Sequence, residues 1–449
     1  MGTFYIKKGK DIKLKGAAEA KVVELSLPAK VAVQPPDFRG LKLRLAVKEG
    51  FAVKRGTTLL TDKVNPDIKI LSPIAGRVSA IVRGDKRALL RVVVEAGSNQ
   101  DVEIFQIYRK EEISNLPCTE LKKALLDGGV WCALRQRPFS KVANPQDTPK
   151  AIFVHAMSTE PLALDIDVAL EGQEELFQAG LNALSRLTDG KVHLCTKAGV
   201  KSKALTQAKN VDMHRFSGPH PAGNVSTHIN LIAPLNKGDL VWYVEAQDVL
   251  NIAKLLTQGT YPNERIVALT GEGVAKAVYA KTIIGAPLSL LLQGSNLMGR
   301  RCLSGSILAG KNVGADGYVC FYDSQVTVIA EGGKREFLGW LSPGFKKYTF
   351  SRTFLSALTP QENVSLDTDE HGGHRAIVLN NLFDSYVALD IYTFFLLKAI
   401  LAEDLDEAEQ LGILECDEED FALASFACPS KTNVGEIIRQ GLDMIEKEG

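Results

Sequence analysis

The hydrophobic pattern of this 449-residue chain changes near residue 100, and that change excludes one uniform architecture. Before it, short runs of β-prone residues alternate with turn residues such as Gly50 and Gly84, a pattern typical of a compact barrel or sandwich of short strands. After it come the apolar run 151–156, a helically spaced segment at 174–187 and the apolar run 191–196. Strand, helix and strand in this order predict an α/β unit with a parallel sheet.

The rest of the chain changes pattern twice more. Residues 265–345 are again β-rich, with many glycines, and the C-terminal part predicts helices at 386–402 and 436–447 around an acidic stretch. Further expected elements are helices at 116–126 and 248–258 and strands at 212–216 and 265–270. We therefore predict an α/β multidomain protein with boundaries at residues 1–104, 105–259, 260–375 and 376–449.

Charge and hydropathy exclude several classes of protein. Lys+Arg and Asp+Glu both number 53, and a balanced chain lacks the surplus cations that nucleic-acid binding needs. No apolar run is long enough to span a bilayer, and the best candidate, residues 391–401, contains Lys398 and predicts a core helix. The N-terminus lacks the apolar region of a signal peptide. These features predict a cytoplasmic protein, either soluble or peripheral to a membrane.

The seven cysteines predict no metal site. None of them form a Cys-x-x-Cys pair and their number is odd, which argues against a zinc site, an iron–sulfur site and a disulfide framework. We expect scattered buried thiols.

Residues 47–81 resemble the barrel-sandwich hybrid of biotinyl and lipoyl carrier domains. The resemblance rests on two glycine turns and on Ser72-Pro73-Ile-Ala-Gly76-Arg-Val78, which matches the motif after the modified lysine. Lys63 stands where that lysine would be, but residues 64–67 lengthen the loop and the preceding methionine is missing. A carrier-like scaffold with no redox role is kept as an alternative.

Residues 128–163 resemble the FMN-binding subunit of respiratory complex I and the C subunit of Rnf complexes, which implies a Rossmann-like domain. Glu160-Pro161 matches the acidic turn of those families, but Arg135 and Arg137 stand in the stretch where they have a glycine-rich flavin loop. Large side chains would crowd a phosphate site that needs bare backbone. We expect neither FMN nor FAD here; a soluble NADH-dependent flavoprotein is the alternative.

The same stretch mixes flat apolar surfaces with cationic donors, a combination that suits a quinone ring with its two carbonyl acceptors. The candidate residues near a quinone are Trp131, Arg135, Arg137, Phe139 and Lys141. The alternative interpretation is a packed Trp and Phe with solvated cations around them.

The loop Gly218-Pro219-His220-Pro221 is the most distinctive in the chain. The two prolines restrict the backbone on both sides of one histidine. Because histidine titrates near neutral pH, His220 is our candidate catalytic proton donor to a reduced quinone oxygen, with Gly218, Pro219 and Pro221 near the ring. A rigid turn at a sheet edge is the alternative.

Two C-terminal segments complete the resemblance to the complex I and Rnf families. Residues 265–310 resemble their soluble-ligand-binding β-grasp module, and residues 415–431 lie where they bind a four-iron cluster. Only Cys428 remains in a recognisable position there, and Cys416 is isolated. Four close thiolates are needed for such a cluster, so we expect none, and the last segment is expected to be a helical domain.

Together these segments identify the chain as a member of the A-subunit family of bacterial sodium-translocating NADH:quinone reductases; the motif at 217–223 is the most specific match. The resemblance implies a peripheral protein on the cytoplasmic face of the inner membrane, with membrane contact through partners only. It implies assembly with the B-, C-, D-, E- and F-subunits of the same complex, chiefly with the B-subunit. Ubiquinone is the implied substrate, at the terminal reduction step, with no complete active site in this chain alone.

Overall fold

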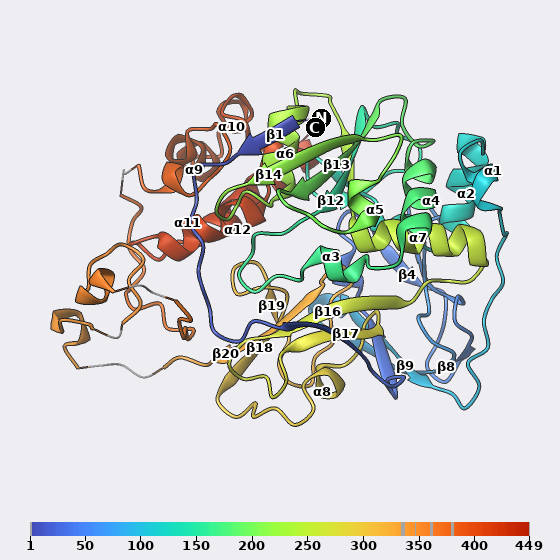
Figure 1. The fold of residues 1–449 in the computed structure, drawn as a ribbon, viewed down its shortest axis with the longest axis horizontal. Helices are drawn as coiled ribbons and strands as arrows, with labels where there is room; N and C mark the ends of the chain where they lie inside the picture. The colour runs from blue at the N-terminus through green and yellow to red at the C-terminus, as the bar shows by residue number, and fades with distance from the viewer. Residues whose placement is uncertain (1, 334–336, 346, 360–361, 379–380, 449) are drawn as a thin grey trace.

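The computed structural model describes residues 2–333, 337–345, 347–359, 362–378 and 381–448. Within them, four β-sheets and a C-terminal group of helices are arranged as Figure 1 shows. The mixed α/β architecture predicted from the sequence is confirmed.

Two small antiparallel sheets form most of the first segment. Their strands, in sheet order, are β3 (Lys30–Val33), β9 (Leu89–Ala96), β8 (Gly76–Arg83) and β5 (Ala52–Val53), and then β4 (Leu43–Leu45), β6 (Thr58–Asp62) and β7 (Lys69–Leu71). The inner residues of both sheets belong to one core that includes Val31, Leu60 and Val92. The short strands predicted before residue 100 are confirmed.

A seven-stranded sheet forms the centre of the molecule. Its order is β1 (Gly2–Tyr5), β14 (Asp212–Ser217), β13 (Lys191–Lys197), β12 (Ala151–Ala156), β15 (Val241–Glu245), β10 (Arg135–Arg137) and β11 (Lys141–Val142). The first five strands are parallel, and β10 and β11 are antiparallel to their neighbours.

Both faces of this sheet are buried, as its continuous apolar strands require. Along β12, Ile152 and Val154 pack into one core and Ala151 and Phe153 into another, because successive side chains point to opposite faces. The first face is covered by α2 (Cys118–Asp127), α4 (Glu174–Leu184), α5 (Lys203–Thr206) and α7 (Ala246–Gln258), and the second by α6 (Val225–Ile232).

The third segment contributes a six-stranded sheet of β19 (Lys311–Asn312), β18 (Arg300–Ser304), β20 (Gln325–Ala330), β16 (Glu264–Thr270), β17 (Val278–Ile283) and β2 (Glu19–Glu24). Regular strands end at Ala330 among the described residues. The prediction that residues up to 345 are β-rich is therefore wrong in its last part, where residues 339–341 form a short 3-10 turn.

The C-terminal helices α9 (Thr393–Leu401), α10 (Leu405–Gln410), α11 (Ala422–Ala427) and α12 (Val434–Glu448) share a core of their own. The predicted last helix is confirmed to within two residues. The predicted helix at 386–402 is wrong over its first seven residues, because α9 begins only at Thr393. There the Asp384 carboxylate accepts a hydrogen bond from the Thr393 backbone N–H, at 3.2 Å, and side-chain acceptors of this kind fix helix starts.

Residues 2–24 form a strap, which we define as β1, β2 and the chain between them. The strap begins in the central sheet, where β1 pairs with β14, and ends in the third sheet, where β2 pairs with β17 (Figure 1). Between them the Gly9 N–H donates to the Ser385 carbonyl and the Lys10 N–H to the His220 carbonyl, both at 2.8 Å. The strap therefore joins three parts of the fold.

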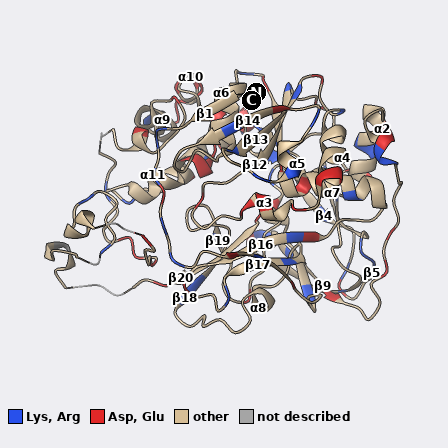
Figure 2. Cartoon of the chain, viewed as in Figure 1, with Lys and Arg blue, Asp and Glu red and all other residues tan. Residues whose placement is uncertain are grey.

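In the described part of the chain, no helix has the length and apolar character to cross a membrane. The apolar run 391–401 largely forms α9, whose Leu396 and Ile400 are buried in the C-terminal core. Basic and acidic residues are interspersed along the chain (Figure 2).

Candidate functional site

A cavity of about 620 Å³ lies where all four segments meet, and we call it the central cavity. It opens at the carboxyl ends of β12 and β15, which are neighbours in the sheet. The strands that follow β12 in the chain, β13 and β14, lie on one side of it, whereas β15 lies on the other, so the strand order switches direction at this point. Ligands of open α/β sheets bind at such a point. Its polar lining includes Arg39, Arg135, His155, Glu160, Glu245, Ser306, Tyr322, Asp323, Asp417, Glu418, Glu419 and Arg439.

Three charged residues are linked at the sheet side of the central cavity. His155 near the end of β12 places its Nδ1 2.9 Å from a Glu245 carboxylate oxygen and its Nε2 2.6 Å from the Gly223 carbonyl. Arg135 reaches the same carboxylate at 3.4 Å. Because a carboxylate and a carbonyl only accept, both ring nitrogens must donate, so His155 is an imidazolium.

The electrostatics of this cluster agree with the geometry. Burial acts against the charged ring, but the charge of Glu245 and the two hydrogen bonds outweigh it and raise the pKa of His155 to about 9. Burial likewise opposes ionisation of Glu245, and His155 and Arg135 overcome it and lower the pKa of that carboxyl. At neutral pH the cluster holds two cations and one anion beside the central cavity.

Arg135 is held by aromatic side chains from two segments. Its guanidinium lies 4.4 Å from the ring centre of Tyr243 and 4.3 Å from that of Tyr322, distances at which cation–π attraction is effective. The Tyr322 hydroxyl is itself fixed by donating to the Cys132 carbonyl at 2.7 Å. Arg135 therefore presents a fixed cation at the cavity wall.

The raised pKa of His155 predicts a loss of stability at alkaline pH. The imidazolium stabilises the folded state fully below the unfolded pKa of about 6.5, and the contribution disappears as the pH rises towards 9. We expect the free energy of unfolding to fall by about 3 kcal/mol across this window, measured by urea unfolding at a series of pH values. The variant His155→Gln should lose this dependence; an unchanged pH profile in that variant would contradict the assignment.

Arg137, on the same strand as Arg135, joins the central sheet to the C-terminal helices. Its side chain is 1% exposed, donates to the Ser226 hydroxyl at 2.8 Å, and lies 3.0 Å from both Asp417 and Glu419. Burial opposes ionisation of Asp417, but Arg137 lowers the pKa of that carboxyl; for Glu419, burial prevails and raises the pKa. These carboxylates line the central cavity, whereas Arg137 itself does not. Arg137 therefore fixes the position of two side chains that form the cavity wall.

Other residues singled out in the sequence lie away from the central cavity. Trp131 is fully buried, donates its indole N–H to the Ala143 carbonyl at 2.7 Å, and contacts Trp242 edge-on. Phe139 packs against the C-terminal core, and Lys141 forms an ion pair with Glu446 at 2.5 Å. The structure thus brings Arg135 and Arg137 to the cavity and its wall and places Trp131, Phe139 and Lys141 in packing and interdomain contacts.

The Gly218-Pro219-His220-Pro221 loop is not part of the lining of the central cavity, and it contacts the strap. Gly218 has a φ of +128°, and a Cβ there would lie 2.2 Å from the Ile6 carbonyl of the strap. The His220–Pro221 peptide bond is cis. The His220 Nδ1 is 3.2 Å from the Thr159 hydroxyl, whereas its Nε2 is buried without a hydrogen-bond partner among the described residues. Burial lowers the pKa of His220 to about 4, so the ring is neutral at pH 7.

His155 and Glu245 were not predicted as site residues. Both stand near or at the carboxyl end of a short apolar run, Ala-Ile-Phe-Val-His-Ala and Val-Trp-Tyr-Val-Glu. A polar residue at the carboxyl end of a parallel strand is the signal that could have found them.

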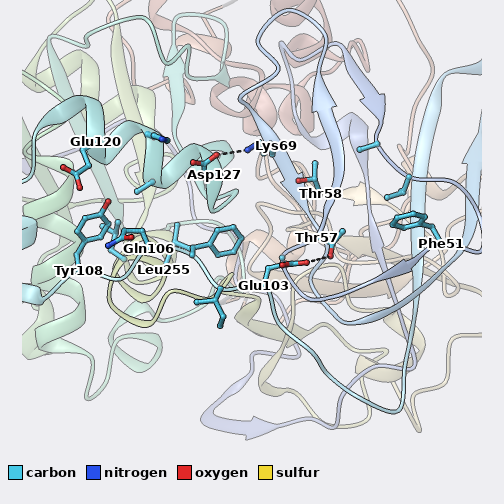
Figure 3. Close-up of a pocket in the computed structure, with 18 residues that line it drawn as sticks. Phe51, Thr57, Thr58, Lys69, Glu103, Gln106, Tyr108, Glu120, Asp127 and Leu255 are labelled. Carbon is cyan, nitrogen blue, oxygen red and sulfur yellow. Dashed lines mark hydrogen bonds and ion pairs between the residues drawn. The ribbon is translucent and has the colours of Figure 1, made fainter.

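A second cavity, of about 880 Å³, lies between the first segment, α2 and α7 (Figure 3). Its charged groups are largely satisfied by protein neighbours: Lys69 pairs with Asp127 at 2.7 Å, and the Thr57 hydroxyl donates to Glu103 at 3.2 Å. The convergence of buried, perturbed titratable groups is found at the central cavity instead, and such convergence is typical of functional sites.

No group of three or more His, Cys, Asp or Glu side chains within the described ranges is arranged to hold a metal ion. Cys416 and Cys428 are both buried in the C-terminal core, and burial raises the pKa of the Cys416 thiol.

Fold and cavity together define a multidomain α/β protein with a polar interdomain site. Models of three domains of one family match the chain: the NqrA N-terminal barrel-sandwich hybrid domain at residues 4–97, the NqrA second alpha/beta domain at 116–261, and the NQRA C-terminal domain at 266–315. The first match agrees with the barrel-sandwich hybrid expected from the sequence.

Curated relatives match over nearly the whole chain. The A-subunit of the Na(+)-translocating NADH-quinone reductase of Yersinia pestis bv. Antiqua (strain Angola) is 42% identical over 448 residues. The A-subunits of the enzymes of the same name from Neisseria meningitidis serogroup B and Pasteurella multocida are each 40% identical over 446 residues. Each alignment covers 99% of both chains. The chain belongs to the A-subunit family of Na⁺-translocating NADH-quinone reductases, which confirms the resemblance found in the sequence.

Proposed function

We propose that this chain is the peripheral subunit of a sodium-pumping NADH:ubiquinone oxidoreductase that contributes to terminal ubiquinone reduction, with the quinone ring bound in the central cavity. The observation that carries the proposal is the cluster of Arg135, His155 and Glu245 at the carboxyl ends of β12 and β15. Reduction of a quinone builds negative charge on its oxygens, and fixed cations stabilise such charge best where water is scarce.

The cavity lining suits a flat ring with polar oxygens. Aromatic surface comes from Tyr322, and cationic donors come from Arg135 and His155. Pockets that hold small ligands combine apolar surface with a few fixed polar groups in this way. His220, our candidate acid from the sequence, is not among the residues that line the cavity, and its pKa is lowered to about 4. We therefore assign it a secondary role, acting through Thr159.

The location and partners belong to the same proposal. We infer that the chain lies on the cytoplasmic face of the bacterial inner membrane, docks chiefly on the B-subunit, assembles with the C-, D-, E- and F-subunits, and meets the membrane only through them. The support is its family, whose members are named as subunits of a sodium-translocating reductase. Co-purification of the tagged chain with these partners tests this assembly.

We also propose that the chain holds no FMN, FAD or iron–sulfur cluster. In the sequence resemblance, Arg135 and Arg137 stand in the stretch that carries the glycine loop of flavin domains. Both lie on β10, and both guanidinium groups are engaged with carboxylates. The visible spectrum of the isolated chain tests this directly, since a bound flavin or cluster would colour it.

The proposal also assigns a fold to the second and third domains. We infer a Rossmann-like second domain, supported by the parallel strands β14, β13, β12 and β15 with helices on both faces. We infer a β-grasp third domain, supported by the mixed sheet in which β16 pairs in parallel with β20.

The substitution Arg135→Ala tests the quinone site. Because it removes the cation held between two tyrosines, we expect the Kd of a water-soluble ubiquinone analogue to rise about tenfold or more, measured by calorimetric titration of the purified chain. The matched control is Arg44→Ala, whose guanidinium is exposed and bonds only to Thr61 among the described residues. Equal affinity in wild type and Arg135→Ala would refute the proposed site.

A further inference from the structure

Glu160 lies in the central cavity and is held there by a different segment of the chain. It follows β12 in the turn Glu160-Pro161, and its Oε1 accepts a hydrogen bond from the Ser306 hydroxyl at 2.7 Å. Ser306 is almost fully buried, and its oxygen also accepts the backbone N–H groups of Leu308 and Ala309, both at 3.2 Å. With its lone pairs taken, the hydroxyl has one proton, which is directed at Glu160.

This arrangement fixes where Glu160 carries its own proton. Because Oε1 accepts from Ser306, a protonated Glu160 bears hydrogen on Oε2. Among the described residues, Oε2 has no hydrogen-bond partner, although the residue lines the cavity. A carboxylic acid with one oxygen anchored and the other facing a ligand space is arranged to donate.

Three titratable side chains from three different elements act on the charge of Glu160. His155 comes from β12, Glu245 from β15 and Asp323 from the loop before β20. Burial acts first to raise the pKa of Glu160, and Asp323 and Glu245 add to it, while Ser306 and His155 oppose the shift. The net effect is a raised pKa, so the acid form persists to higher pH than in an exposed glutamate.

We propose that Glu160 is the acid that protonates the reduced quinone ring, with Ser306 as its positioning residue; the assignment rests on the quinone site proposed above. Two electrons reach the ring from the NADH-oxidising complex. The O–H bond on Oε2 breaks as a new O–H bond forms on a ring oxygen, and the bonding pair stays on the carboxylate. Ser306 and the His155 imidazolium stabilise that anion. Solvent water then reprotonates Glu160 and supplies the second ring oxygen with its proton.

The test is Glu160→Gln in the assembled complex, because glutamine keeps the size and the acceptor for Ser306 but has no acidic proton. We expect quinol formation near pH 7 to fall about 100-fold. We also expect the wild-type rate to decline at rising pH as Glu160 ionises, and the variant to lack this decline. The Kd of the ubiquinone analogue should stay within about twofold. Glu160→Asp should restore part of the rate and the pH-dependent decline, and it provides the readout if the glutamine variant does not assemble.

The matched control is Glu120→Gln, which removes a carboxylate that lines the second cavity near Tyr108 (Figure 3) and should leave quinol formation unchanged. If Glu160→Gln binds the analogue and forms quinol at the wild-type rate at every pH, the acid assignment fails while the quinone site stands. If Glu160→Gln loses binding, the residue is a binding group and not the acid. If the wild type itself binds no analogue, the proposed site and the acid fail together.

Discussion

Replacing Arg137 by alanine is expected to lower the free energy of unfolding by about 3–5 kcal/mol, because it removes the nearest cation of the buried Asp417 carboxylate. Arg137 is 1% exposed and lies 3.0 Å from both Asp417 and Glu419. The loss should be measured by urea unfolding at pH 7. Limited proteolysis should show the C-terminal helices released first, since these contacts join them to the central sheet.

The control is Lys191→Ala, which removes a shorter but exposed ion pair with Asp212, at 2.7 Å. Exposed pairs contribute less than about 1 kcal/mol, so this variant should unfold almost as the wild type does. Arg137→Lys should give an intermediate loss, because one ammonium cannot bridge the partners that a guanidinium reaches. Equal losses for Arg137→Ala and Lys191→Ala would show that burial of the cluster has no energetic weight.

Replacing Trp131 by alanine should also cost about 3–5 kcal/mol, the usual loss when a fully buried large aromatic is truncated. Its ring is fully buried, lies 5.5 Å from the ring of Trp242, and its N–H bonds to the Ala143 carbonyl. Thermal and urea unfolding of the purified variant measure the loss.

The variant Trp131→Phe separates the two interpretations drawn from the sequence. Phenylalanine fills most of the space but leaves the Ala143 carbonyl without its donor, which costs about 1–3 kcal/mol. If Trp131 only packs, this variant should bind the ubiquinone analogue with wild-type affinity. A clear loss of affinity in a folded Trp131→Phe protein would instead place the indole near the quinone.

Local sequence was enough to predict the elements whose burial follows a simple period. The strand at 151–156 was predicted with its observed bounds because both its faces are apolar, and α7 was predicted to within two residues. The strand β10 was not predicted, since Arg-Gln-Arg has no strand-like pattern. Its Arg137 side chain is buried through ion pairs with Asp417 and Glu419, far away in the sequence, and no local window contains that information.

The candidate site shows the same division. Arg135 was predicted as a site residue because its stretch of sequence mixes aromatic and cationic side chains, and the structure places it in the central cavity. His155 and Glu245 were not, because their meeting depends on β12 and β15 being adjacent in the sheet. Sheet order is a property of the whole fold. Residues that meet only because their strands are neighbours in the sheet cannot be predicted from separate sequence motifs.

The strap has a consequence for how the polypeptide matures on the ribosome. Its strands β1 and β2 are translated first, but their partners β14 and β17 emerge only much later. Until then, the backbone N–H and C=O groups of β1 and β2 have no strand partner, and exposed strand edges of this kind promote misassociation of nascent chains. The central sheet cannot be completed before β15 has been translated, and β2 has no partner before β17 has. Chaperone dependence during biosynthesis should therefore be greatest before β17 leaves the exit tunnel.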